Sequence, residues 1–155
     1  GLTKEDKFWS RLLNSKIALE FKNKIEGDFK YVINPGNTST PLLNIIPKKW
    51  KEIIGQEVLI QFQGNSLKFY LHHANKNSAE KLIKFSKSQI QCKNIKFKKI
   101  TKRKENSCYI LETKLTDNLN DDFTLKDIYR FLVTFYENID NKIIKNYTTF
   151  TKYNS

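Results

Sequence analysis

Apolar residues recur at helical spacing near the N-terminus of the chain. Thr3 is a suitable N-cap, with Asp6 three residues on, and the apolar positions continue to near Ile25. This pattern predicts a helix that is either continuous or broken at Asn14–Ser15. The positions expected to face the core are Trp9, Leu12, Leu13, Ile17 and Leu19.

Three further segments have helical patterns. Pro47 and Gly55 bracket a short helix over residues 47–54. Asn77 or Ser78 caps a second helix, and Thr124 with Asp127 three residues later caps a third. The inner positions of the second are expected to be Ala79, Leu82, Ile83, Ser86 and Ile90. Those of the third are expected to be Leu125, Ile128, Leu132, Phe135 and Ile139.

Alternating patterns predict strands. The clearest pair covers residues 58–62 and 67–72, joined by a hairpin turn at 63–66 in which Gly64 and Asn65 supply positive φ. Its register should bury Val58, Ile60 and Phe62. Shorter strands are expected at 29–33, 95–98 and 108–115, residues 43–46 are short and apolar, and residues 34–41 have the composition of a loop.

This order of elements predicts an α+β fold. We expect an antiparallel sheet of about four to five strands with helices packed on one face. The 155 residues fit a single domain, 1–155, with enough aromatic and aliphatic residues for a core. The chain begins at Gly1 and contains no Met, so we expect it to be excised from a larger protein.

The charge of the chain is concentrated in one segment. The formal net charge is +12, and residues 81–104 contain ten basic side chains and no acid. A polyanion would neutralise such a segment, and nucleic acid, DNA or RNA, is the partner expected. The alternative is that AT-biased coding enriches Lys, which then only solubilises the surface.

Within this segment the lysines follow the predicted elements. Lys84 and Lys87 are one helical turn apart, and Lys96 and Lys98 share one face of the next strand. If that helix and strand are neighbours, the two rows join. Lys predominates over Arg, which favours holding the phosphate backbone over reading bases. The expected phosphate contacts are Lys84, Lys87, Lys96, Lys98, Lys99, Lys102, Arg103 and Lys104.

A second candidate site is Lys48, Lys49 and Trp50. The indole could stack on a base between lysine–phosphate contacts. The alternative, which is commoner for a large aromatic on a short helix, is that Trp50 belongs to the core. Tyr70 is a further candidate for stacking.

Catalytic patterns are weaker. Glu112 and Lys114 on a predicted strand resemble the last motif of restriction-type nucleases, in which a carboxylate holds Mg²⁺. Those enzymes also need an Asp on a preceding strand, and the nearest earlier one is the distant Asp28. His72 and His73 should point to opposite faces of their strand and so cannot chelate one ion. We therefore expect no metal or other cofactor and no catalytic residues.

Several short motifs resemble an uncharacterised bacterial and archaeal domain that accompanies predicted restriction-type nucleases. They are Phe8-Trp9 with Leu12-Leu13, the strand at residues 67–71, the helix from Ser78, and the helix that ends at residues 135–139. The resemblance implies a DNA-related accessory role and carries over no catalytic residue.

Two alternatives to nucleic-acid binding stay open: a Mg²⁺-dependent nuclease using Glu112 and Lys114, and a module that docks a protein or assembles with other subunits.

No apolar run approaches the roughly 20 residues that span a bilayer, and no signal peptide is visible, so we expect no membrane contact. Cys92 and Cys108 form no metal-binding motif, and reduced thiols in an intracellular protein are expected.

Overall fold

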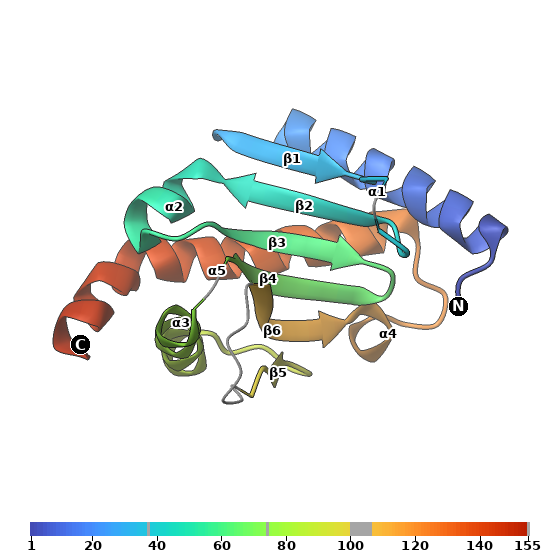
Figure 1. Cartoon of the computed structure of the whole chain (residues 1–155). Coiled ribbons are helices and arrows are strands. Elements are labelled where there is room, and N and C mark those ends of the chain that lie inside the picture. The colour runs from blue at the N-terminus through green and yellow to red at the C-terminus, as the bar shows by residue number, and fades with distance from the viewer. Residues whose placement is uncertain (37, 74, 100–106, 155) are drawn as a thin grey trace.

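The computed structural model describes residues 1–36, 38–73, 75–99 and 107–154, the side chain of Ser107 excepted. Its centre is a six-stranded sheet in the order β1-β2-β3-β4-β6-β5, in which all neighbouring strands are antiparallel (Figure 1). The strands are β1 (Phe29–Ile33), β2 (Leu42–Pro47), β3 (Val58–Gln63), β4 (Ser66–His72), β5 (Lys96–Phe97) and β6 (Ser107–Lys114).

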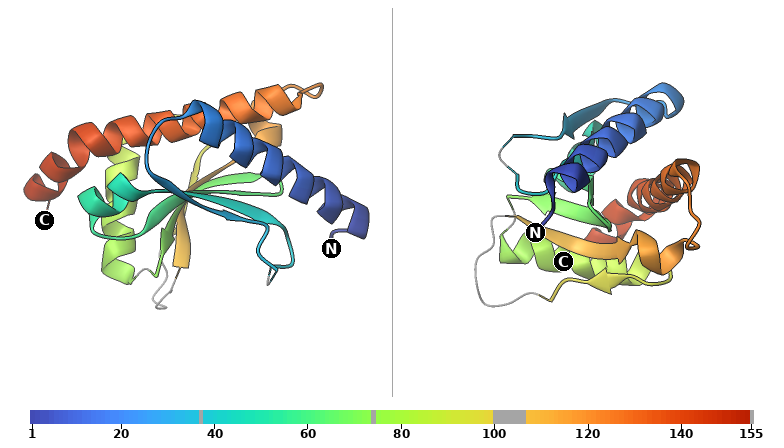
Figure 2. Two further views of the ribbon diagram at one scale, coloured as in Figure 1. Left: turned by 90° about the horizontal axis from the view of Figure 1, so that it is seen from above. Right: turned by 90° about the vertical axis from the view of Figure 1, so that its right-hand side faces the viewer.

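In the described part of the chain five helices surround this sheet, and two of them, the first and the last, lie across one of its faces. The helices are α1 (Lys4–Lys24), α2 (Lys48–Ile54), α3 (Lys76–Gln89), α4 (Leu115–Asn118) and α5 (Leu125–Tyr153). Figure 2 shows α1 and α5 together on the same side of the sheet. The α+β class and the antiparallel sheet are therefore confirmed, with one or two strands more than the pattern predicted.

The covered face carries the core. Val58, Ile60 and Phe62 are each at most 2% exposed, and they pair in register with Leu71, Phe69 and Leu67 of β4. The hairpin register is thus as predicted. Its two-residue turn has positive φ at Gly64 alone and not at Asn65, the pattern of a type II′ turn.

Helix α1 is continuous, and its predicted inner stripe is right at Ile17 and Leu13, which packs against the core, but wrong at its other three positions. Both capping-box hydrogen bonds between Thr3 and Asp6 are present. Buried positions are Asn14, Ile17, Ala18 and Phe21, whereas Trp9, Leu12 and Leu19 are exposed. Asn14 is tolerated in the core because its side-chain amide donates to Asn34 Oδ1 at 2.9 Å.

Two other helices differ from prediction at their ends. α3 begins after Asn75, whose side chain accepts from the backbone of Ser78, instead of at residue 77 or 78. α5 begins at the Thr124–Asp127 capping box as predicted, but continues to Tyr153. Its additional turns bury Ile143 and Tyr147 and pack against α3 through the contact of Tyr147 with Phe85.

Candidate nucleic-acid interface

The second face of the sheet carries no helix across β2, β3 and β4 in the described part of the chain, and it is turned toward the viewer in Figure 1. We call it the open face. Directly paired residues of neighbouring strands point to the same side. Lys68 pairs with Gln61 and Glu112, and Glu112 pairs with Lys96, so one polar row crosses four strands.

A second row contains aromatic residues. Leu59 pairs with Tyr70, and Tyr70 with Tyr109 on β6. The Nζ of Lys98 lies 5.3 Å from the centre of the Tyr109 ring, which places Lys98 over the same face. Both tyrosines are half-buried, so their rings are partly available to solvent.

The open face is strongly biased toward positive charge. The register adds Lys114 beside Ser66 and Lys30 beside Ile46. Among the described residues, the ionisable side chains that the register or ring contacts place on it, excluding Tyr and His, are Lys30, Lys68, Lys96, Lys98, Lys114 and Glu112. Within this set, one carboxylate therefore lies among five ammonium groups, and Glu57, whose backbone pairs with that of His72 just before β3, is the next acid in the same alternation.

Four lysines of this set, Lys30, Lys68, Lys96 and Lys114, belong to no ion pair among the described residues. The ion pairs within residues 1–36, 38–73, 75–99 and 107–154 are Lys24–Glu20, Lys48–Asp28, Lys49–Asp140 and Lys76–Glu80. None of these pairs includes Lys30, Lys68, Lys96 or Lys114. These four ammonium groups keep their charge available for an anion.

The basic segment predicted from the sequence divides between two surfaces. Lys87 Nζ lies 5.8 Å from the Phe97 ring centre, so α3 and β5 are neighbours, as expected. Phe97 pairs with the core residue Leu111, however, so Lys87 approaches β5 from the covered side, opposite Lys96. The two predicted rows meet around the edge of the sheet instead of forming one flat row.

The other predicted phosphate contacts of that segment either are not placed on the open face by a strand pairing or ring contact, or belong to residues that the structure does not describe. Lys84, with Lys81, borders a small cavity that Phe150 and Asn154 of the α5 end also line, away from β5. Lys99 follows β5 and is exposed. Lys102, Arg103, Lys104 and the turn predicted at 102–106 lie outside the described residues.

The second predicted site has no aromatic ring available for stacking at Trp50. Trp50 is completely buried, and its Nε1 donates to Asp140 Oδ1 at 2.8 Å. Lys49 pairs with the same carboxylate at 3.3 Å, and Lys48 lies 3.5 Å from Asp28. Stacking of Trp50 on a base is therefore excluded, and its interpretation as a core residue is confirmed.

Tyr109, Lys30, Lys68 and Lys114 were not predicted as interface residues. For Tyr109 the reason is a register shift between Phe69 and Tyr70. Simple alternation from Glu112 would turn Tyr109 toward the core, but the irregularity brings it opposite Tyr70. The lysines could have been found from strand alternation. Lys68 is an outward position of the predicted hairpin, and the same alternation on the other strands gives Lys30 and Lys114.

The neighbours of Glu112 bear on the nuclease alternative. The cross-strand neighbours of Glu112 are Lys68 and Lys96, not carboxylates. Among the described residues no three His, Cys, Asp or Glu side chains lie close enough to hold a metal ion. Cys92 is exposed and Cys108 is buried.

The prediction that His72 and His73 point apart is wrong. Their ring centres are 4.4 Å apart in an edge-to-face contact. His73 lies beyond the end of β4 with φ of 53°, a left-handed conformation that ends strand alternation and folds its ring back against His72.

Comparison of the chain with family models, with curated proteins and with solved structures gives no match. The interface is therefore interpreted from its own geometry. In the described part of the chain, no helix has the length and apolar character needed to cross a membrane.

Proposed function

We propose that this domain binds nucleic acid on the open face, with its lysines contacting backbone phosphates. The observation that carries the proposal is the placement of five lysines and one carboxylate on a sheet face without a helix across its central strands. Compact folding of a chain with net charge +12 is opposed by self-repulsion, which a bound polyanion relieves.

The composition of the face favours single strands held without sequence preference. Its described cations are all lysines, which act as point charges, whereas reading guanine edges relies on the fork of Arg. Tyr70 and Tyr109 lie among these lysines and offer ring surface to unpaired bases. The resemblance to a domain that accompanies restriction-type nucleases stays a prediction that agrees with this function.

A titration at two salt concentrations tests the proposal. Labelled single-stranded DNA, RNA and duplex DNA are titrated with the chain at 50 and 200 mM salt, and anisotropy gives the affinity. Five phosphate contacts to a single strand should weaken binding by about 10²-fold over this fourfold rise. Absence of binding to all three nucleic acids at 50 mM salt would contradict the proposal.

Glu112→Gln separates binding from the nuclease alternative. Removing the carboxylate that lies between Lys68 and Lys96 should tighten binding several-fold at low salt, because it removes a repulsion from phosphate. A nuclease that uses Glu112 would instead lose Mg²⁺-dependent cleavage. The affinity and cleavage of one oligonucleotide by both proteins decide between these outcomes, and weaker binding together with lost cleavage favours the nuclease.

A further inference from the structure

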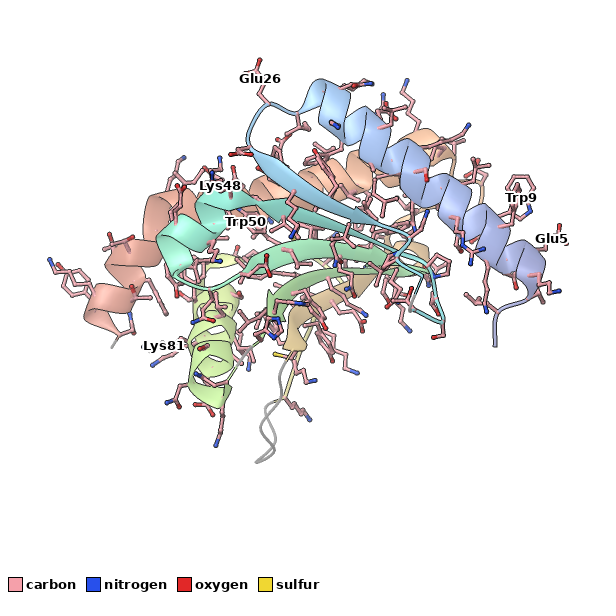
Figure 3. All side chains as sticks on the ribbon, turned by 45° about the horizontal axis from the view of Figure 1, so that its top comes forward. Glu5, Trp9, Glu26, Lys48, Trp50 and Lys81 are labelled. Carbon is pink, nitrogen blue, oxygen red and sulfur yellow. The ribbon has the colours of Figure 1, made fainter. Side chains whose placement is uncertain are left out.

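The N-terminal half of α1, residues 4–13, contributes no buried residue to the domain. The first buried position of the helix is Asn14. Figure 3 shows Glu5 and Trp9 near the free end of α1, directed away from the sheet. These ten residues extend about 15 Å as helix, and they are attached to the domain at their C-terminal end, where Leu13 packs partly buried against the core and the Arg11 carbonyl accepts from Asn34 Nδ2.

This segment is nevertheless apolar on its solvent side. Phe8 and Trp9 are each 57% exposed and Leu12 is 39% exposed. The two aromatic rings touch edge to face, with centres 5.2 Å apart. At 100° per residue, these side chains lie on the side of the helix opposite Ile17 and Phe21, so α1 has a second apolar side that the fold leaves uncovered.

Charges of opposite sign flank that apolar side. Glu5 precedes Phe8 and Trp9, and Lys16 follows Leu12, at helical spacings that keep all of them on one side of α1. Neither Glu5 nor Lys16 belongs to an ion pair within the described residues. A helix with an acid at one end of an apolar side and a base at the other is complementary in charge to a second copy of itself that runs in the opposite direction.

We propose that two copies of this chain pair through the N-terminal halves of their α1 helices, antiparallel and around a two-fold axis. Glu5 of one copy then faces Lys16 of the other in two equivalent pairs, and Trp9 packs against Leu12 across the axis. Such an interface is isologous and closes at two copies, so it makes dimers and not filaments. A parallel pair would instead place like charges together.

The area of this apolar side determines the expected affinity of the dimer. Phe8, Trp9 and Leu12 expose together roughly 300 Å² in each copy, so covering them in both copies removes on the order of 600 Å², which is less than a standard specific interface. A weak dimer that dissociates at about tens of micromolar is therefore expected. The surface is separate from the open face, because α1 lies on the covered side of the sheet (Figure 2).

Sedimentation velocity of the whole chain between 1 and 200 μM tests this pairing. The wild type should pass from monomer to dimer, and Trp9→Glu should stay monomeric at 200 μM. The matched control is Ile144→Glu, which places the same charge at a 51% exposed position on α5 and should dimerise as the wild type does. Far-ultraviolet circular dichroism checks that all three proteins are folded.

Charge exchange tests the antiparallel arrangement itself. Glu5→Lys alone and Lys16→Glu alone each create two repulsive pairs, and each should weaken the dimer at least tenfold. Mixing the two variants creates two attractive pairs and should restore association, as should the double exchange within one chain. A wild type that stays monomeric at 200 μM, or a mixture no stronger than the single variants, overturns the proposal; neither result bears on nucleic-acid binding.

Discussion

Reversing two charges of the open face, Lys68→Glu with Lys96→Glu, should weaken binding of single-stranded oligonucleotides by about 10²-fold or more at 50 mM salt. Both lysines pair in register with Glu112 and belong to no ion pair among the described residues. Each lost charge-assisted contact is worth about 1.5 kcal/mol, and the two together give this hundredfold change.

The matched control is Lys22→Glu with Lys126→Glu, which changes the net charge equally but from exposed positions on α1 and α5, the helices of the covered side. We expect the control to bind within about fivefold of the wild type, through long-range charge alone. The salt dependence of the open-face variant should also be shallower, by about 1.4 in the logarithmic slope for two lost contacts. Equal losses in both variants would show that net charge matters and the open face does not.

The elements of this fold could largely be predicted because their local patterns agree with their tertiary surroundings. The strand pair β3–β4 alternates cleanly, and the capping boxes at Thr3 and Thr124 mark where α1 and α5 begin. Periodicity was misleading where an apolar residue has no place in the core. Trp9 and Leu12 fit a helical stripe, but the N-terminal half of α1 extends beyond the sheet that would bury them.

The candidate site was harder to predict because it depends on strand neighbours that are distant in sequence. The concentration of lysines in residues 81–104 drew attention to β5, and Lys96 and Lys98 lie on the open face. Their neighbours Lys68, Tyr70 and Tyr109 come from β4 and β6, and only the strand order brings them together. No local pattern specifies that order or the register shift that turns Tyr109 outward.

Replacing Trp50 with Ala should lower the free energy of unfolding by about 3–5 kcal/mol, a large part of the 5–15 kcal/mol typical of a domain. The indole is fully buried, with its ring centre 5.6 Å from those of Phe69 and Tyr136. Removing it leaves a cavity where α2, β4 and α5 meet. Urea denaturation followed by circular dichroism measures the change, with the slope checked against that of the wild type.

Trp50→Phe distinguishes the packing of the ring from its hydrogen bond, and it remains informative if the Ala variant does not fold. Phe keeps much of the buried ring but cannot donate to Asp140, which still pairs with Lys49. We therefore expect a smaller loss, about 1–2 kcal/mol. Since Trp50 is inaccessible, this variant should bind oligonucleotides as the wild type does under conditions where both are folded. Unchanged stability together with weakened binding would instead assign Trp50 to the nucleic-acid interface and contradict its place in the core.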